Sequence, residues 1–258
     1  MPRLAANLSL LFTELPFLER FAAAAACGFR AVEFLFPYEE RVEAVAAARQ
    51  AAGVAVALFN LPAGDFAAGE RGLAAVPGRE ADFAAGLERA LPYAQALGAE
   101  RLHVMAGIAP AGSRPLYLDN LRRAADFFGV RGFGLSIEPI NQRDMPGYHL
   151  STQADAVAVL DAVGRPNLGL QMDFYHCQIT EGDLFRRLEA HLPRIVHTQI
   201  AGVPERQEPD RGEVAYDRLL AHLNALGYAG WVGCEYRPRA GTAAGLGWAA
   251  AYGIRPQG

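Results

Sequence analysis

Short apolar runs, rich in leucine and β-branched residues, alternate with longer segments of helical period along the whole chain of 258 residues. This alternation is typical of repeated βα units, in which a helix follows each strand and the strands build a parallel sheet. We count eight such units, and a chain of 27.7 kDa has the usual size of one barrel of this kind. The sequence therefore predicts an α/β fold, a single (β/α)8 TIM barrel spanning residues 1–258.

Local signals place the elements of this barrel. The strands are expected at 4–12, 31–36, 54–61, 101–107, 134–141, 167–173, 195–201 and 231–236. The helices are expected at 16–27, 39–52, 79–97, 116–128, 152–163, 184–191 and 216–226, with a last short segment near 242–252. Ser151 and Asp183 stand at helix starts, where their side chains can cap the first turn. Glycines stand just past five of the helical runs, where a left-handed residue ends a helix: Gly28, Gly53, Gly98, Gly164 and Gly227.

The connections between these elements are uneven in length. Long ones follow the third, fourth, fifth and seventh strands, at 62–78, 108–115, 142–150 and 202–215, whereas the helix-to-strand turns are short. In a βα barrel, the connections that leave the strands lie at the carboxyl-terminal face, where active sites are built. The asymmetry favours an enzyme over a binding module with loops at both ends.

The apolar run at 135–141 carries a carboxylate, Glu138, one residue before a proline. Alternation along a strand puts Ser136, Glu138 and Ile140 on one face. Because both faces of a strand in a closed parallel barrel are covered, an inward acid at this position needs a partner. A metal ion is one such partner.

Three more predicted strands end in an oxygen-bearing side chain, namely Asp173, Gln199 and Glu235. With Glu138 they can converge on the barrel mouth, and we expect these four residues to bind one metal ion. Carboxylate and amide oxygens favour Mg²⁺ or Mn²⁺ over Zn²⁺. The alternative is that the three acids pair with arginines at the rim, for which Arg237 and Arg239 follow Glu235 closely.

Other polar residues near the predicted mouth are candidates for contact with a substrate. His176 lies on the loop that leaves the sixth strand, and Arg206 could bind a carboxylate through its planar guanidinium. His103 and His197 are expected to face the barrel interior, where His103 could also touch a substrate. Glu33 is a further inward acid, which we assign to packing or to support of the site.

Composition excludes several classes of function. The net charge of −4 and the scattered positive residues predict no nucleic-acid partner and no membrane partner. The chain has no lysine, which removes Schiff-base chemistry and the P-loop. Its three cysteines are far apart and no signal peptide is recognisable, so the cytoplasm is the expected location. Gly245 and Gly247 resemble a nucleotide loop, but they follow the last strand instead of the first.

Eight short runs are distributed along nearly the whole chain: Ala6-Asn7-Leu8-Ser9, Phe59-Asn60-Leu61-Pro62-Ala63-Gly64-Asp65, Gly69-Glu70-Arg71-Gly72, His103-Val104-Met105-Ala106-Gly107, Ile137-Glu138-Pro139-Ile140-Asn141, Asp144-Met145-Pro146-Gly147-Tyr148, Gln199-Ile200-Ala201-Gly202 and Gly233-Cys234-Glu235-Tyr236. With these runs the chain resembles the hydroxypyruvate isomerase family, which belongs to the xylose isomerase-like barrels.

The resemblance implies a metal-dependent isomerase that interconverts hydroxypyruvate and tartronate semialdehyde through a cis-enediolate. By position, Glu138 and Glu235 are similar to the acid/base pair, and Asp173 and Gln199 to the other metal ligands. Gln199 stands where sugar epimerases of the superfamily usually have histidine. The residues expected to contact the substrate are Asp144, His176, Arg206, Asn60 and His103.

The sequence is also compatible with other functions. Isomerisation of 2-oxotetronates would use the same groups on a substrate one carbon longer, and a small-sugar epimerase would also use this site. A catalytically inactive barrel that acts as a binding protein is disfavoured because all four ligands are present. A metal-dependent endonuclease is disfavoured because it would need more histidine ligands and a basic groove. The expected partner is a small hydroxy-oxo acid, and a homo-oligomer is compatible with this assignment.

Overall fold

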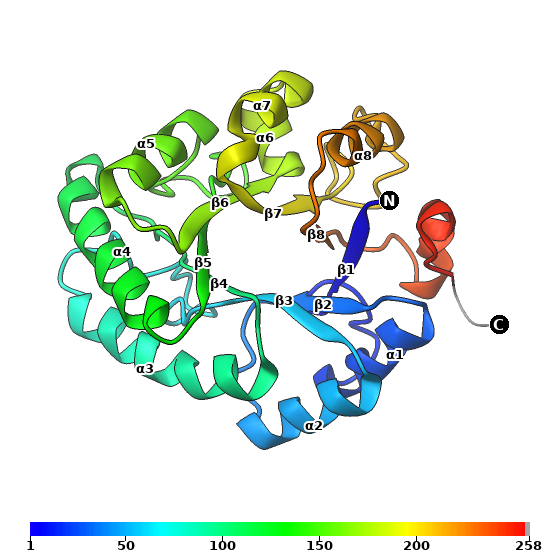
Figure 1. The fold of residues 1–258 in the computed structure, drawn as a ribbon, viewed down its shortest axis with the longest axis horizontal. Coiled ribbons are helices and arrows are strands. Elements are labelled where there is room, and N and C mark those ends of the chain that lie inside the picture. The colour runs from blue at the N-terminus through cyan, green and yellow to red at the C-terminus, as the bar shows by residue number, and fades with distance from the viewer. Residues whose placement is uncertain (256–258) are drawn as a thin grey trace.

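The computed structural model describes residues 1–255, and its strands form a closed parallel barrel in chain order from the first to the eighth. Figure 1 shows this ring of strands inside a ring of helices. The predicted TIM barrel is confirmed. The strands are β1 (Arg3–Asn7), β2 (Ala31–Phe34), β3 (Ala55–Asn60), β4 (Arg101–His103), β5 (Gly134–Ile137), β6 (Leu168–Asp173), β7 (Ile195–Ile200) and β8 (Trp231–Cys234).

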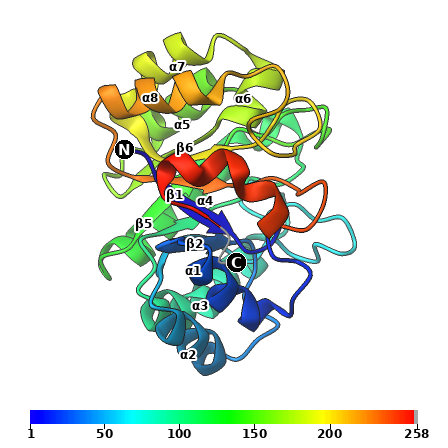
Figure 2. The same ribbon diagram turned by 90° about the vertical axis from the view of Figure 1, so that its right-hand side faces the viewer.

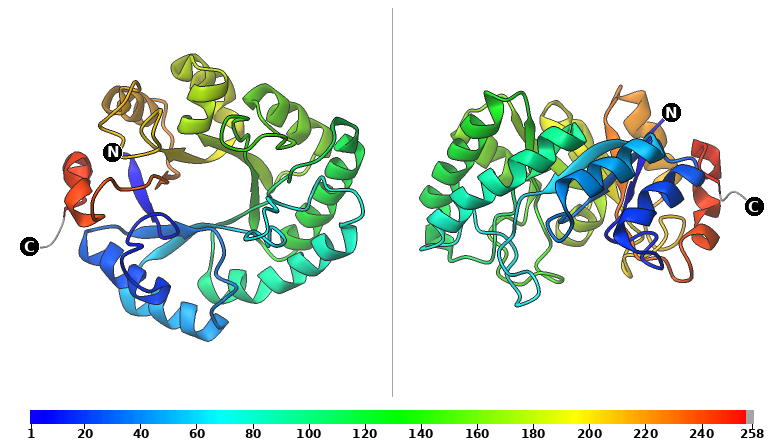
Figure 3. Two further views of the ribbon diagram at one scale, coloured as in Figure 1. Left: turned by 180° about the vertical axis from the view of Figure 1, so that it is seen from behind. Right: turned by 90° about the horizontal axis from the view of Figure 1, so that it is seen from below.

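Helices follow the strands, and Figure 3 shows them on the outside of the barrel from two further sides. The α-helices are α1 (Arg20–Ala26), α2 (Val42–Ala52), α3 (Glu80–Leu97), α4 (Arg114–Gly129), α5 (Gln153–Val163), α6 (Phe174–Thr180), α7 (Leu184–His191) and α8 (Tyr216–Ala225). The 3₁₀-helices are η1 (Phe17–Glu19), η2 (Ala111–Ser113), η3 (Leu192–Arg194) and η4 (Ala243–Tyr252). Among residues 1–255, no helix combines the length and apolar character needed to cross a bilayer.

Every strand except β6 ends earlier than predicted. β1 stops at Asn7 because the Asn7 carbonyl accepts hydrogen bonds from the backbone N–H groups of Leu10 and Leu11, which turn the chain. β5 stops at Ile137 and β8 at Cys234, so Glu138 and Glu235 lie one residue beyond their strands. Apolar residues continue past the last hydrogen bond of each strand ladder, so strands predicted from apolar runs are too long.

The helix starts differ in part from the prediction. Asp183 stands at the N-cap of α7, but its side chain makes no capping hydrogen bond. The N-cap of α5 is Thr152 instead of Ser151, and its hydroxyl accepts a hydrogen bond from the Asp155 N–H at 3.1 Å. Helix α6 was not predicted, because it begins directly after β6 with no loop between them. Asp173 ends the strand and also caps this helix, since its Oδ1 accepts from the Tyr175 N–H at 2.8 Å.

Aromatic side chains fill part of the layer between the strands and the first helices. Phe34 of β2 stacks on Phe59 of β3 at 5.9 Å between ring centroids, and Phe21 of α1 meets Phe34 edge-on at 5.8 Å. Such pairs add about 0.5–1.5 kcal/mol each to the free energy of burial. They fix α1 against the strands that carry the first part of the mouth.

The barrel interior changes character from one end to the other. Near the amino ends of the strands, Ala5, Ala31, Ala57 and Trp231 form a small apolar cluster. Two residues further along β1, β2 and β8 the inward positions are Asn7, Glu33 and Gly233. Because alternate residues of a strand face the same side, this next layer is polar, where a barrel of this type is usually filled with branched apolar side chains.

The segment that follows β8 closes the outside of the barrel. Figure 2 shows η4 lying across the side where β1 and β8 meet, between α1 and α8. The Thr242 hydroxyl before η4 accepts a hydrogen bond from the Phe12 N–H at 2.6 Å, and the Arg255 N–H donates to the Cys27 carbonyl at 2.8 Å. These contacts tie both ends of η4 to the β1–α1 region.

Candidate active site at the barrel mouth

The acids predicted from the strand ends meet at the mouth of the barrel. Single donor atoms of Glu138, Asp173 and His176 all lie within 4.8 Å of one another. His176 reaches this group because α6 begins directly after β6, so that His176, in the first turn of α6, lies over the mouth. Asp173 is fully buried, and Glu138 has 5% of its surface exposed.

Two oxygens in this group have no hydrogen-bond partner, namely Glu138 Oε1 and Asp173 Oδ2. Burial raises the pKa of Glu138 well above its ordinary value, and the neighbouring Glu235 and Asp173 raise it further. Burial also raises the pKa of Asp173 to about 6, although Arg206 opposes this change. Because a buried acceptor without a donor is costly, the two free oxygens mark a place for a cation.

Arg206 lies between Glu235 and Asp173. Its Nη2 is 3.2 Å from Glu235 Oε1 and 3.7 Å from Asp173 Oδ2. The backbone of Arg206 has a φ of 56°, so a left-handed residue turns the β7–α8 loop and directs this side chain into the mouth. Burial raises the pKa of Glu235 to about 8 even though Arg206 lowers it.

The arginines named as alternative partners of the acids do not take this role. Arg239 pairs with Glu208 at 3.3 Å, and Arg237 is exposed. Arg206, expected to bind a substrate carboxylate, is the arginine that meets the acids. Its proposed contact with substrate remains a prediction.

The hydrogen bonds of Asn141 fix the protonation of His176. Asn141 Oδ1 accepts from the Asp144 N–H at 2.8 Å, so its Nδ2 is the atom that faces His176 Nδ1 at 2.6 Å. His176 Nδ1 must then accept, and burial together with Arg206 lowers the pKa of His176 well below its ordinary value. The neutral ring therefore carries its proton on Nε2, which lies 3.6 Å from Asp173 Oδ2 and 3.9 Å from Glu138 Oε1.

Asp144 belongs to a polar group on the rim. Its Oδ2 accepts from the Tyr175 hydroxyl at 2.7 Å, and Arg143 donates to the same hydroxyl at 3.0 Å and to the Pro204 carbonyl at 3.0 Å. Burial raises the pKa of Asp144, but the hydrogen bonds of Tyr175, Asn141 and Arg143 outweigh it and the net pKa is lowered. This group connects the loop after β5 to the loop after β7.

The other predicted substrate contacts line a cavity of about 860 Å³ above the acids. His103 Nδ1 lies 3.6 Å from Glu138 Oε2, and its Nε2 has no partner. Burial and the nearby His197 lower the pKa of His103 to about 3, so this ring is neutral. Asn60 lies on the same wall, where its amide contacts the sulfur of Met105 at 3.5 Å.

Gln199 lies below the cavity and does not line it. It is paired in register with Asp173 on the neighbouring strand, and its Oε1 accepts from Gln171 Nε2 at 2.7 Å. Its Nε2 donates to Glu33 Oε1 at 2.8 Å. The amide therefore belongs to the polar layer beneath the carboxylates, and its oxygen is the atom turned away from Glu33.

Sequence reasoning missed part of this arrangement. Tyr175, Arg143 and Asn141 were not singled out, and only their nearness to Asp173 and Asp144 in the sequence could have indicated them. Gln171 stands two residues before Asp173 and so on the same face of β6, which was a usable signal.

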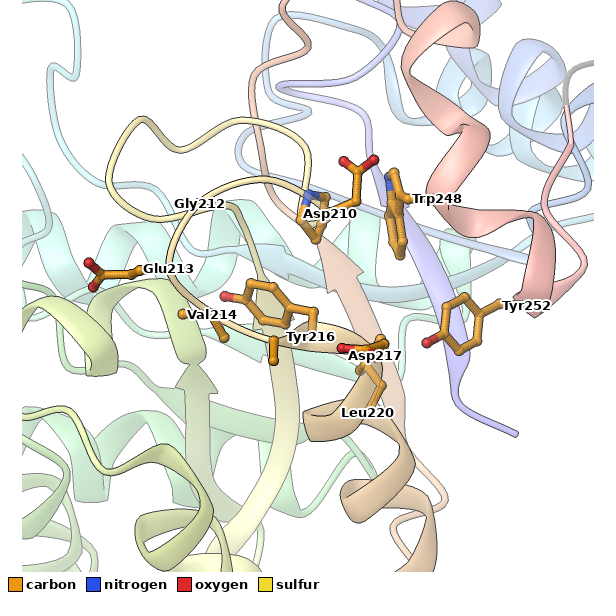
Figure 4. Close-up of a pocket in the computed structure, with 11 residues that line it drawn as sticks. Asp210, Gly212, Glu213, Val214, Tyr216, Asp217, Leu220, Trp248 and Tyr252 are labelled. Atoms are coloured by element: carbon orange, nitrogen blue, oxygen red, sulfur yellow. The ribbon is translucent and has the colours of Figure 1, made fainter.

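A second cavity of about 470 Å³ lies outside the barrel, between the loop after β7, α8 and η4. Figure 4 shows Trp248 and Tyr252 of η4 facing Asp210 and Tyr216 across it. Its lining includes none of the candidate site residues. The loop at 202–215 thus presents Arg206 to the mouth and its later residues to this outer cavity.

Comparison with known proteins identifies relatives over the whole barrel. The family profile described as a xylose isomerase-like TIM barrel matches residues 21–252. A protein of Cupriavidus necator named 2-oxo-tetronate isomerase is 56% identical over 98% of this chain and 99% of its own. A protein of Escherichia coli named hydroxypyruvate isomerase is 46% identical over 96% of this chain and 98% of its own.

A solved structure from Brucella melitensis is also similar. It is described as an AP endonuclease of family 2, and it is 47% identical over 98% of this chain and 99% of that one, with a TM-score of 0.96. The family and the barrel are therefore shared by proteins whose names differ.

Proposed function

Because this chain belongs to the xylose isomerase-like TIM barrel family, and within it to the hydroxypyruvate isomerases, we propose that it interconverts hydroxypyruvate and tartronate semialdehyde with a divalent metal ion. The protein is an isomerase. The observation that carries the proposal is the pair of buried carboxylate oxygens without donors, Glu138 Oε1 and Asp173 Oδ2, beside a third acid, Glu235.

The acids at the mouth, together with Gln199 beneath them, fit a hard cation. Glu138, Asp173, Gln199 and Glu235 would supply oxygen ligands, which suits Mg²⁺ or Mn²⁺. Asp173 can use Oδ2 for this purpose, because its Oδ1 already caps α6. When bound, the metal ion supplies positive charge that stabilises the developing oxyanions of an enediolate.

Glu138 and Glu235 would move the protons of the reaction. Shifting the carbonyl of hydroxypyruvate from C2 to C3 requires one proton to leave C3 and one to arrive at C2. The two glutamates come from β5 and β8 and approach the mouth from different sides of the barrel. Each can take or return a proton, because their buried surroundings hold the pKa of both above the range of an exposed carboxylate.

Neutral side chains and one cation would orient the substrate. The Nε2–H of His176 points toward the acids and can donate to a substrate oxygen, while Asp144 holds Tyr175 at the rim. Arg206 can bind the substrate carboxylate through its planar guanidinium. Asn60 and His103 would form the opposite wall of the cavity.

A second candidate is isomerisation of a 2-oxo-tetronate, which has one more carbon. The observation in its favour is the 56% identity to the relative of that name. The cavity of about 860 Å³ leaves room for the longer acid. Both reactions need the same acids, so they differ only in which substrate the cavity prefers.

The endonuclease activity suggested by the name of the Brucella protein is less well supported here. Asp173 and Glu138 are almost fully buried beneath loops. A DNA backbone needs an exposed basic groove, and two of the arginines that line the mouth are already paired with acids: Arg206 and Arg143.

The deciding experiment is a panel of substrates assayed with Mg²⁺, with Mn²⁺ and after chelation. Hydroxypyruvate and 2-oxo-tetronate are expected to turn over only with metal, and abasic DNA is expected to remain intact. The ratio of kcat/KM for the two acids ranks the two candidates. Full turnover of the acids in a preparation without detectable metal would contradict the proposal.

Solvent deuterium tests the proton route. In D₂O, proton transfer is expected to place deuterium on the product carbon, whereas a direct hydride shift carries the substrate hydrogen across. A substrate with two deuterons at C3 gives the complementary measurement, since water should progressively dilute its label. Full retention of that label would support the hydride shift instead.

A further inference from the structure

Glu33 is a fully buried acid in the middle of the barrel, one layer below the candidate metal ligands. Its Oε1 accepts from Asn7 Nδ2 at 2.9 Å and from Gln199 Nε2 at 2.8 Å. Its Oε2 lies 2.6 Å from His197 Nε2, which must donate because a carboxylate only accepts. Three donors from β1 and β7 therefore converge on one side chain of β2.

The barrel leaves space for this carboxylate at Gly233. A Cβ atom built on Gly233 would overlap both oxygens of Glu33, so no other residue type fits there without displacing them. Gly233 is also the register partner of Gln199 on the neighbouring strand. The gap in β8 allows the side chain of Glu33 to reach from β2 to the amide on β7.

The hydrogen bonds that start at Glu33 have only one possible direction. The carboxylate must face the nitrogen of Gln199, so the oxygen of Gln199 accepts from Gln171 Nε2 at 2.7 Å. The oxygen of Gln171 then accepts from the Ser136 hydroxyl at 2.8 Å. If the Gln199 amide were reversed, its oxygen would face the carboxylate and two acceptors would be in contact.

We propose that Glu33 is a positioning residue that holds the Gln199 amide with its oxygen available to the metal ion. This inference rests on the proposed function, in which Gln199 is a metal ligand. An amide oxygen has two lone pairs, and Gln171 occupies one. The other is free for a metal ion, and Gln199 is paired in register with Asp173, whose Oδ2 has no hydrogen-bond partner.

A purely structural role does not explain why position 33 carries a buried carboxylate. The layer beneath Glu33 is closed by Ala5, Ala31, Ala57 and Trp231, so apolar side chains alone fill this level of the barrel. Burying a carboxylate is expensive unless donors surround it, and apolar replacement of a buried charge is often neutral or stabilising. What only a carboxylate provides is a fixed choice between the two ends of the Gln199 amide.

The test is Mn²⁺ binding, followed by the loss of the electron paramagnetic resonance signal of free Mn²⁺. Glu33→Gln keeps the shape of the side chain but can also donate, so the amide of Gln199 can reverse. The Kd for Mn²⁺ is expected to rise about 10–100-fold, as for other residues that orient metal ligands. Asn7→Ala is the matched control, because it removes a donor to the same oxygen and leaves the Gln199 bond.

A double variant separates positioning from a general effect on the fold. Gln199→Ala is expected to weaken Mn²⁺ binding by itself, and adding Glu33→Gln is then expected to change the Kd no further. Glu33→Asp keeps the charge but withdraws it by one methylene group, so a smaller rise in Kd is expected. If Glu33→Gln does not fold, the Kd of Glu33→Asp for Mn²⁺ tests the proposal in its place.

The outcomes distinguish this inference from the proposed function. A wild-type protein that binds no Mn²⁺ would overturn both. A wild-type protein that binds Mn²⁺, together with wild-type affinity in Glu33→Gln and Glu33→Asp, would overturn only the role of Glu33. Losses that add in full in the double variant, or an equal loss in Asn7→Ala, would likewise show that Glu33 does not act through Gln199.

Discussion

Glu33 and Glu138 are both buried glutamates inside the same barrel, but their surroundings are opposite. Glu33 accepts hydrogen bonds from three side chains, whereas Glu138 has one oxygen with no donor at all. The two layers that contain them differ in the same way. A buried acid surrounded by donors holds its neighbours in place, while a buried acid short of donors is available to bind a cation or a proton.

The difference follows from where each residue stands in its element. Glu33 lies within β2, where Asn7 of the neighbouring β1 and His197 and Gln199 of β7, across the barrel, present donors to it. Glu138 lies just past β5 and before a proline, beyond the last residues of β5 that pair with β4 and β6. The mouth therefore exposes acids to ligands, and the interior layer beneath it does not.

The largest effect is expected when either glutamate of the mouth, Glu138 or Glu235, is replaced by its uncharged amide. Glu138→Gln and Glu235→Gln are each expected to lower kcat by about 10³-fold or more, because each loses a group to which the proposed function assigns proton transfer and cation binding. Steady-state kinetics gives the loss of kcat, and the metal content of the same preparation shows how much of it comes from weaker cation binding. Near-normal kcat in either folded, metal-loaded variant would contradict its role as acid or base.

The next largest effect is expected from the cation that stands among the acids. Arg206→Ala should raise the KM for hydroxypyruvate about 10–100-fold, and less for dihydroxyacetone, because only the acid loses an ion pair. Matched kinetics on both compounds give the measurement. Equal increases for both would mean that Arg206 serves mainly to neutralise Glu235 and Asp173.

Glu235 at the mouth is expected to make the stability of the protein depend on pH. Glu235 has a folded pKa of about 8, above its value in the unfolded chain, so the unfolded chain binds fewer protons between pH 6.5 and 9. Stability of the metal-free protein should fall as pH rises through this window. His103, with a pKa of about 3, acts in the opposite direction only below about pH 6.5.

Thermal unfolding between pH 6.5 and 9 measures this slope. With a chelator, Tm is expected to fall by a few degrees across the window, and saturating Mg²⁺ should remove most of the fall because a cation compensates the ionised acids. The Glu235→Gln variant is the control, since it lacks the ionising group. An unchanged slope in that variant would place the pH dependence elsewhere.

The smallest effect is expected outside both layers. Thr152→Ala removes the hydroxyl that caps α5 and should lower the free energy of unfolding by about 1 kcal/mol. The kcat should stay at the wild-type value, because Thr152 contacts neither acid layer. Chemical denaturation and kinetics on one preparation provide both numbers, and a fall in kcat would show that α5 influences the mouth.

The periodicity of the sequence was enough to predict the barrel and the strand ends that carry Glu138, Asp173 and Glu235. It could not predict that Arg206 meets these acids, since the contact depends on a left-handed residue in a long loop. Helix α6 was missed because Asp173 ends a strand and caps a helix at once. The contacts of Glu33 cross the barrel from β2 to β7. A local sequence pattern cannot predict contacts between residues so far apart in the chain.

The one-way chain of hydrogen bonds from Ser136 to Glu33 has a consequence for redesign of this enzyme. A histidine at position 199, as in sugar epimerases, has one acceptor nitrogen with a single lone pair, so while it donates to Glu33 it could accept from Gln171 or bind a metal ion, but not both. A library that varies Gln171, Gln199 and Glu33 together can rebuild both hydrogen bonds. Positions in this layer are therefore best mutated together.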